Sequence, residues 1–258
     1  MLNELRIGVE SYGVGDEVPN NIRHSLSLGL EELAIAPCAH DGTFVIVGSS
    51  PSVVDHLEMI RSDKAAGRSI CAINGGHDFL MERGITPDLF LTTDPRPMPQ
   101  NFKHINDTTV YLMASRCSPE SFETLKDKHV ILWHAWAEGL ENDEYKGRMA
   151  IGGGSTSGLR AINVGYILGY RKFHLYGMDS CLAENKAKRW DSGPLHDETK
   201  TIDVHVGGRE FLCNMAMAQQ AQEFQSVYDI MGDIHIECFG DGLISAIIEE
   251  RKKQGLHT

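Results

Sequence analysis

The feature that most constrains the fold is a short apolar run that ends abruptly in a turn of small residues. Residues 44–47, Phe-Val-Ile-Val, are followed by Gly48-Ser49-Ser50-Pro51-Ser52, and a helical pattern then runs from Val54 to Ile60. An apolar run that leads through a loop into a helix is typical of a buried parallel strand. The first turn of such a helix has free backbone N–H groups and a partial positive charge, so it can bind phosphate. Similar residues also close many strand-to-helix turns that bind nothing, so both interpretations stay open here.

Strand-like and helix-like patterns alternate along most of the chain. This alternation predicts an α/β fold, a Rossmann-like three-layer sandwich with a mainly parallel central sheet. In such sheets, ligands bind beyond the carboxyl ends of the strands. The expected strands are 43–47, 69–73, 88–92, 109–114, 129–134, 172–176 and 234–239, and the main expected helices are 53–64, 78–83, 119–126, 155–168, 209–231 and 244–254.

The pattern divides the chain into a leader and one domain. Residues 1–42 are expected to be an N-terminal leader, with a candidate helix over 20–33, and residues 43–258 are expected to form the Rossmann-like domain. The polar stretch 183–208 has little periodicity and predicts either a functional lid or a plain surface loop.

Composition excludes several classes of protein. The 258 residues carry a net charge of −12, so broad binding to duplex nucleic acid is not expected, because phosphate contacts need clustered lysine and arginine. The six cysteines form no Cys-x-x-Cys pair, which favours small buried thiols over a zinc or redox site. No apolar run reaches membrane-spanning length and no signal peptide is visible, so a cytoplasmic protein without a membrane span is expected.

Polar residues follow several of the predicted strands. Asn74 has an amide that can both donate and accept hydrogen bonds, so it can contact a base, sugar or phosphate. Asp94 and Asp179 could bind Mg²⁺ or a ribose, and Arg96 could neutralise phosphate charge. Each has a structural alternative: a turn residue for Asn74, an internal ion pair for Asp94 with Arg96, and a turn cap for Asp179.

A second small-residue turn lies at the start of the helix predicted over residues 155–168. Gly152-Gly153-Gly154-Ser155 lets the backbone approach a ligand closely and offers Ser155 as an N-cap. No lysine follows the glycines, and the motif does not directly follow a strand, so ordinary P-loop and Rossmann fingerprints are disfavoured. His196 and His205, in the polar stretch, are candidate general bases, although surface histidines are common.

Three blocks of the sequence together resemble one family. The blocks are 45–52, which looks like a Gly-x-Gly-Pro-Ser loop; 72–95, with Ala-Ile-Asn, Gly-Ile-x-Pro-Asp and Thr-Asp-Pro; and 153–179, which ends in Leu-Tyr-Gly-Met-Asp. In this order they resemble the archaeal 6-hydroxymethylpterin diphosphokinase (MptE-like) group. That group shares its domain with the motility accessory factor proteins of flagellin glycosylation. Bacterial sialyltransferases that use CMP-sialic acid are similar in the same blocks.

The resemblance implies a transferase with a nucleotide-linked donor and a hydroxyl acceptor. In the diphosphokinase branch, which we place first, ATP passes a diphosphoryl group to a pterin alcohol with Mg²⁺. In the glycosyltransferase branch, a CMP-sugar is the donor. A nucleotide-binding or scaffold protein without turnover is a third hypothesis, because fold does not fix function. By position, Asp94 and Asp179 would be catalytic and metal-binding, His205 or His196 would be the base, and the donor would contact Gly48, Ser49, Ser50, Ser52, Asn74, Arg96, Gly153, Gly154 and Ser155.

Overall fold

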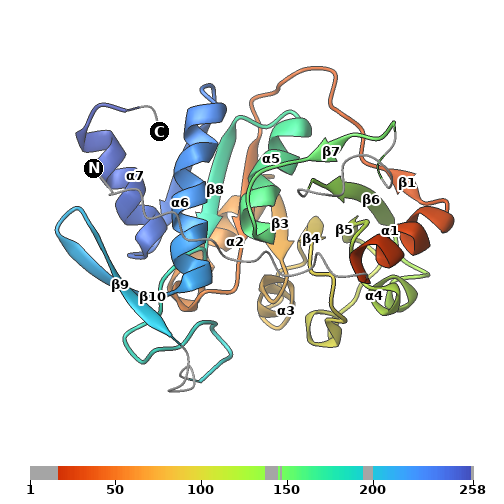
Figure 1. The fold of residues 1–258 in the computed structure, drawn as a ribbon, viewed down its shortest axis with the longest axis horizontal. Helices are drawn as coiled ribbons and strands as arrows, with labels where there is room; N and C mark the ends of the chain where they lie inside the picture. The colour runs from red at the N-terminus through yellow and green to blue at the C-terminus, as the bar shows by residue number, and fades with distance from the viewer. Residues whose placement is uncertain (1–16, 137–144, 146, 194–199, 257–258) are drawn as a thin grey trace.

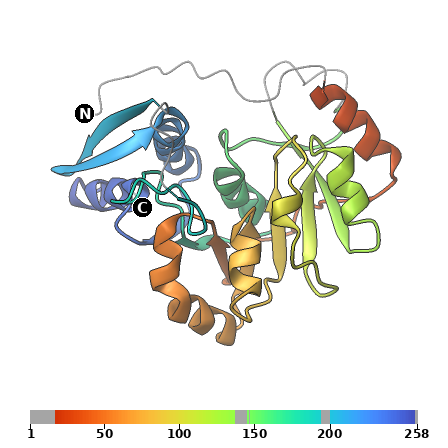
Figure 2. The same ribbon diagram turned by 90° about the horizontal axis from the view of Figure 1, so that it is seen from below.

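A sheet of parallel strands runs through the middle of the molecule and carries helices on both faces (Figure 1 and Figure 2). The computed structural model describes residues 17–136, 145, 147–193 and 200–256. Within the sheet the strand order is β1-β6-β5-β4-β3-β2-β8-β11, and β7 pairs with β6. The predicted α/β Rossmann-like sandwich is therefore confirmed.

The described strands of this sheet lie close to the predicted ranges, except for the two-residue strands at 31–32 and 150–151, which the sequence did not predict. They are β1 (Glu31–Glu32), β2 (Thr43–Val47), β3 (Ser69–Ile73), β4 (Leu89–Thr92), β5 (Val110–Ala114), β6 (Val130–Ala135), β7 (Ala150–Ile151), β8 (Lys172–Tyr176) and β11 (His235–Phe239). The helices are α1 (Glu17–Ser27), α2 (Leu57–Ala65), α3 (Gly76–Met81), α4 (Pro119–Thr124), α5 (Ser157–Ile167), α6 (Met215–Ile230) and α7 (Leu243–Lys253), with 3-10 turns η1 (Pro51–His56) and η2 (Pro99–Asn101). Among the described residues, none of these helices combines the length and apolar character that crossing a bilayer requires.

Strand β2 shows why the central strands are apolar without interruption. Successive side chains of a strand point to opposite faces of the sheet. Val45 and Val47 pack in a cluster with residues of α2 and α3, whereas Phe44 and Ile46 pack in a second cluster with residues of α5 and α6. Figure 2 shows these helix pairs on opposite sides of the sheet. Both faces of the strand are therefore covered, as expected for a parallel sheet.

The structure corrects the expectation for residues 201–231. Where the sequence suggested the end of a loop or lid and then a helix from residue 209, β9 (Thr201–Val206) and β10 (Arg209–Asn214) form an antiparallel hairpin. In β10, Phe211 and Cys213 are buried and their neighbours are more open, which is the two-residue period of a strand. The turn uses Gly207 and Gly208, both with positive φ. Helix α6 begins only after Asn214, whose side chain caps it.

Residues 17–32, which the sequence assigned to a leader, pack as part of the same sheet and its helices. Strand β1 pairs in parallel with β6, at the edge of the sheet. In α1, Val18 and Ile22 are fully buried. The side-chain amide of Asn21 donates to the carbonyl oxygen of Pro95 at 3.1 Å and to that of Arg116 at 3.0 Å. This helix is therefore attached to the loops that follow β4 and β5.

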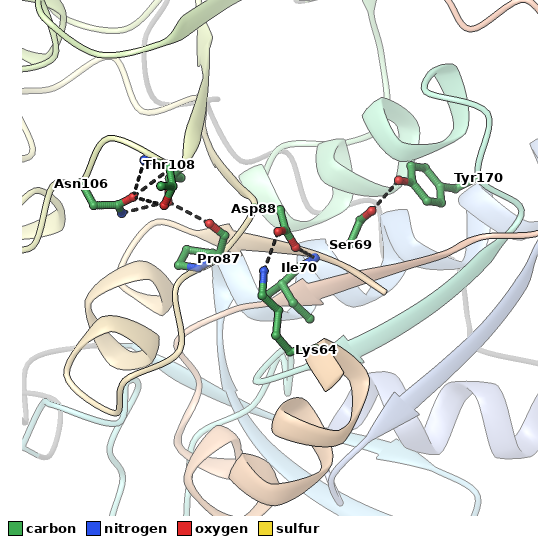
Figure 3. Close-up of polar contacts among 9 residues, drawn as sticks. Lys64, Ser69, Ile70, Pro87, Asp88, Asn106, Thr108 and Tyr170 are labelled. Carbon is green, nitrogen blue, oxygen red and sulfur yellow. Dashed lines mark hydrogen bonds and ion pairs between the residues drawn. The ribbon is translucent and has the colours of Figure 1, made fainter. Parts of the chain in front are cut away.

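Asp88 holds together the amino ends of β3 and β4 (Figure 3). Its carboxylate accepts hydrogen bonds from the backbone N–H of Ile70 at 2.8 Å and from Nζ of Lys64 at 2.5 Å. In the next turn, the hydroxyl of Thr109 donates to the carbonyl oxygen of Pro87 at 2.8 Å. These bonds lie at the edge opposite the predicted ligand site, so Asp88 has a structural role.

Asp63 of α2 is the centre of a buried polar network against β8. Its side chain is only 6% exposed. Its carboxylate accepts hydrogen bonds from a guanidinium nitrogen of Arg68 and, at 3.0 Å, from the hydroxyl of Tyr176, and Nδ1 of His174 lies 2.9 Å away. Burial, followed by the nearby Asp63 carboxylate, raises the pKa of the Tyr176 hydroxyl. One helix side chain thus connects α2 to the sheet.

We expect Asp63→Ala to lower the free energy of unfolding by about 2 kcal/mol, because it leaves the buried hydroxyl of Tyr176 and the half-buried Arg68 without their acceptor. Urea denaturation would measure the change. Glu58→Ala is the matched control on the same helix, since the Glu58–Arg61 ion pair is exposed and such pairs contribute little. Equal stability of the two variants would contradict the role given to Asp63.

Candidate functional site

The strand order places the candidate site where β2, β3 and β8 end. The chain adds β3, β4, β5 and β6 on one side of β2, and β8 and β11 on the other side. In open α/β sheets, ligands bind beyond the carboxyl ends of the strands at this kind of switch point. The loops that leave β2 and β8 begin at Gly48 and Gly177, and Asn74 follows β3. Three of the predicted segments therefore meet at one edge of the sheet.

Glycines from these three loops pack backbone against backbone. A Cβ on Gly48 would lie 2.4 Å from the carbonyl oxygen of Gly177, and a Cβ on Gly76 would lie 2.2 Å from that of Val47. The N–H of Gly48 donates to the carbonyl oxygen of Tyr176 at 2.8 Å. Side chains at these positions would force the loops apart, so the glycines set the spacing of the site.

The backbone amides of the loop after β2 are mostly used within the protein. Ser50 N–H donates to the carbonyl oxygen of Gly177 at 3.0 Å, and Val53 N–H donates to that of Ser50 at 3.1 Å. Ser52 N–H donates to Oδ2 of Asp179 at 3.3 Å. In the described part of the chain, Ser49 has the one N–H of residues 48–53 without a hydrogen bond. The free amides that the sequence suggested for phosphate are therefore largely occupied, and the turn that follows is the 3-10 turn η1.

Asp179, directly after β8, lies against this loop. Its Oδ1 accepts a 2.5 Å hydrogen bond from the hydroxyl of Ser52, and its N–H donates to the hydroxyl of Ser50 at 3.3 Å. Burial raises the pKa of the Asp179 carboxyl above its ordinary value, and the hydrogen bonds from Ser52 oppose this shift. The side chain is half-buried, so a ligand at the edge can reach it.

Asn74 occupies the position between the β2 and β4 loops. Its backbone has a positive φ of 49°, a conformation that asparagine tolerates better than most residues. Its side-chain oxygen is buried and has no hydrogen-bond partner among the described residues. Buried polar atoms in proteins almost always have a partner, so this oxygen is suited to accept a hydrogen bond from a bound molecule.

Asp94 and Arg96, after β4, form an internal ion pair. Arg96 donates from Nε and Nη2 to the two carboxylate oxygens of Asp94, at 2.9 and 2.6 Å, and its backbone N–H donates to Oδ1 at 3.0 Å. The structure therefore contains the structural alternative named above, in which this ion pair stabilises the loop. Both residues still lie at the carboxyl edge, two strands away from β2.

Asp94 and Asp179 are too far apart to bind one metal ion together. The strands that carry them, β4 and β8, are separated by three strand spacings, or about 14 Å. No group of three or more histidine, cysteine or acidic side chains with metal-binding geometry occurs within the described residues. A Mg²⁺ ion at either carboxylate would therefore need most of its ligands from a donor's phosphates and from water, as Mg²⁺ often has.

At the second glycine turn, residues 152–155, a carboxylate from another part of the protein accepts the available hydrogen bonds. The N–H and hydroxyl of Ser155 donate to Oε2 of Glu223, in α6, at 2.8 and 2.7 Å. The N-cap of α5 is Thr156, not Ser155 as the sequence suggested. The hydroxyl of Ser157 lies 3.0 Å from that of Thr93, at the end of β4. Gly153, Gly154 and Ser155 thus stand near the β4 end of the edge, with an acidic group at the predicted anion position.

Of the two predicted histidine bases, the structure describes His205 and places it apart from this arrangement. His205 is exposed in β9, 3.7 Å from Glu210, and lines a surface cavity of about 300 Å³ together with Glu250 and Arg251 of α7. Helix α7 begins beside Asp179, and Glu250 is seven residues further along, or about 11 Å. The structure therefore places His205 away from the edge. His196 lies outside the described residues.

Two groups of residues at this edge were missed by the sequence analysis as site residues. Arg189 and Trp190, from the polar stretch, pack over the turn that contains Gly75. His77 and Asp78, in the first turn of α3, are buried, and their side-chain nitrogens and oxygens have no hydrogen-bond partner in the described structure. Nδ1 of His77 lies 3.5 Å from Oδ1 of Asp78, longer than a normal hydrogen bond. Burial lowers the pKa of His77, against the raising effect of Asp78. No local sequence signal distinguishes these residues from ordinary turn and helix positions.

We expect Gly48→Ala to lower the free energy of unfolding by about 2 kcal/mol, because the added methyl group meets rigid backbone and overpacking has costs of this size. Thermal and urea denaturation would measure the loss. Gly152→Ala is the control, since a Cβ there meets nothing within 4 Å. If Gly48→Ala were as stable as Gly152→Ala, the three loops would not be in the close contact described.

Comparison with solved structures finds the same fold in a larger protein. The Maf glycosyltransferase from Magnetospirillum magneticum AMB-1 superposes with a TM-score of 0.64 at 14% sequence identity, and the match covers 94% of this chain. The chain spans only 42% of the length of that protein. At this identity the likeness shows the fold alone.

Comparison with protein families gives a more specific result. No curated protein matches the chain. Residues 20–185 match the family described as "6-hydroxymethylpterin diphosphokinase MptE-like". The match covers more than half of the chain, includes the loops after β2, β3, β4 and β8, and agrees with the resemblance noted in the sequence. The chain belongs to the 6-hydroxymethylpterin diphosphokinase MptE-like family.

Proposed function

We propose that this protein is a transferase that binds a nucleotide-linked donor at the carboxyl ends of β2, β3 and β8. The observation that carries the proposal is the buried, unpartnered side-chain oxygen of Asn74 at the switch point of the sheet. It lies in the same row of loops as Gly48 and the half-buried Asp179. An amide can recognise a base or a ribose, and a carboxylate can accept the proton of an attacking hydroxyl.

The family favours a diphosphokinase-like reaction with ATP as donor. In this reaction the acceptor hydroxyl oxygen bonds to the β-phosphorus of ATP, the bond from that phosphorus to the α–β bridging oxygen breaks, and AMP leaves. Asp179 is our first choice for the group that accepts the hydroxyl proton, because its raised pKa brings it closer to neutrality, where general bases work best. A pterin alcohol is the acceptor that the family name suggests.

In this proposal, Mg²⁺ binds together with the phosphates of the donor. Asp179 or Asp94 would supply one carboxylate ligand, and the ion would offset negative charge on the phosphates. Since the two carboxylates stand three strands apart, only one of them would contact the ion.

A CMP-sugar-dependent glycosyltransferase is the second candidate. It is supported by the fold shared with the Maf glycosyltransferase over nearly the whole chain. The two candidates differ in the base of the donor, in the number of phosphates and in the need for metal, so one binding experiment separates them.

We expect ATP with Mg²⁺ to raise the melting temperature of the protein more than GTP, CTP, CMP or a CMP-sugar, because a ligand that binds only the folded state stabilises it by mass action. A thermal-shift panel with and without Mg²⁺ measures this. Stabilisation by CMP or its sugar without a metal effect would favour the glycosyltransferase instead. No response to any nucleotide would contradict a nucleotide-linked donor.

We expect Asn74→Gly to weaken binding of the stabilising nucleotide by about tenfold, which corresponds to one hydrogen bond in a buried site. Glycine suits the positive φ at this position, so the turn should remain intact while the amide is removed. Isothermal titration would give the affinity, and a melting curve would confirm the fold. Lys186→Gly is the control, because Lys186 also has a positive φ but is exposed. Unchanged affinity in Asn74→Gly would exclude the amide from the site.

A further inference from the structure

The candidate site needs positive charge that its loops do not supply. The amides after β2 are mostly bonded within the protein, Asp179 lies against them, and Asp94 adds a second carboxylate two strands further along the same edge. At the second glycine turn, Glu223 occupies the Ser155 N–H. ATP and CMP-sugars are anionic, and the whole chain has a net charge of −12. A donor would therefore be repelled unless cationic side chains stand close to the edge.

The segment from Ala183 to Gly193 is fixed directly over the edge. The N–H of Trp190 donates to the carbonyl oxygen of Ser49 at 3.0 Å, and its indole N–H donates to that of Gly75 at 3.4 Å. The indole ring packs edge-on against Phe79, and the guanidinium of Arg83 lies 4.7 Å from the centre of the ring. One tryptophan thus ties this segment to the loops after both β2 and β3.

This attachment brings the side chain of Arg189 to the Asn74–Gly75 turn. The guanidinium of Arg189 lies so close to Gly75 that a Cβ there would be 2.3 Å from one of its nitrogens. Arg189 also donates to Asp191, at 3.0 and 3.2 Å, which orients the guanidinium. Lys188 is the preceding residue, is exposed, and makes no hydrogen bond or ion pair with any described residue.

The electrostatics agree with this placement. Partial desolvation, followed by the nearby positive charges of Arg189 and Arg96, lowers the pKa of Lys188. The positive charges of Arg189 and Arg96 therefore act on Lys188, although they come from two separate segments. Asp94 and Asp191 offset part of the charge of the two arginines, whereas Lys188 has no ion-pair partner among the described residues, so an anion beside Lys188 would be favourable.

We propose that Lys188 and Arg189 bind the phosphate groups of the donor at the Asn74–Gly75 turn. This inference rests on the proposed function for the nature of the ligand, and it assigns the phosphate contacts to side chains instead of the Gly48 loop. Lys188 acts as an accessible point charge, and Arg189 presents a fixed planar donor group. Both residues follow the stretch that matches the family, which ends at residue 185.

The test compares Lys188→Gln with Lys186→Gln by isothermal titration. Each variant removes one exposed lysine charge from the same segment, but only Lys188 directly precedes Arg189 and has a pKa lowered by partial desolvation and by the charges of Arg189 and Arg96. The probes are inorganic pyrophosphate, ATP and CMP, with adenosine and cytidine as uncharged controls, each with and without Mg²⁺. We expect Lys188→Gln to weaken pyrophosphate and nucleotide binding by about tenfold, the effect of one charge-assisted hydrogen bond, and to leave nucleoside binding unchanged. Lys186→Gln should match the wild type, and added salt should reduce the difference.

The outcomes separate the two proposals. If the wild type binds nucleotide and Lys188→Gln binds it equally well, the phosphate contact is overturned and the proposed function stands. If the wild type binds pyrophosphate through Lys188 but binds no nucleotide, the contact stands and the nucleotide donor is overturned. Failure of the wild type to bind any of the charged probes overturns both. Melting curves of the two variants show whether either substitution affects folding.

Discussion

The close approach of Gly48 to Gly76 and Gly177 is the constraint on which the candidate site depends. Three loops from neighbouring parallel strands touch through backbone atoms, so there is no room at these positions for a side chain. The same contact directs the amides of Gly48 and Ser50 toward the carbonyl groups of Tyr176, at the end of β8, and of Gly177, directly after it. Backbone hydrogen bonding is thereby used to hold the loops together, and recognition of a ligand is left to side chains around them.

The protein places its own carboxylates at both positions where the sequence predicts an anion. Asp179 accepts hydrogen bonds from Ser52, and Glu223 accepts two from Ser155. These pairs satisfy the exposed donors of small-residue turns without a ligand, since an acidic side chain is stabilised near such N–H groups. A phosphate at either turn would have to displace a carboxylate, which favours a site where cations, and not free amides, provide the attraction.

The sequence predicted the sheet well because strands such as β2 and β5 are buried on both faces and are therefore nearly unbroken apolar runs. It missed the hairpin of β9 and β10, although Thr201–Val206 alternates polar and apolar residues as a half-buried strand does. The short alternating segment follows a polar stretch without periodicity, and β10 leads into α6 without a break, so the two together resemble one long helix. The polar edge residues Asn74, Asp94 and Asp179 were found from their place after strands. The carboxylate partners could not be found in this way, because Ser52 and Asp179 are 127 residues apart and Ser155 and Glu223 are 68 apart. The place of Lys188 and Arg189 depends on Trp190 reaching Ser49 and Gly75, contacts that no local pattern encodes.

The number of phosphates in the donor determines how the charge at this edge can be balanced. A CMP-sugar has a single phosphodiester charge, which one or two cationic side chains can neutralise without a metal. ATP has several more negative charges than Lys188 and Arg189 can offset, and the two arginines, Arg96 and Arg189, are also engaged with Asp94 and Asp191. A triphosphate would therefore need Mg²⁺ beside the cationic side chains, with Asp179 or Asp94 as its one protein carboxylate. The degree to which donor binding depends on Mg²⁺ as well as on Lys188 therefore distinguishes ATP from a CMP-sugar, whichever acceptor the protein uses.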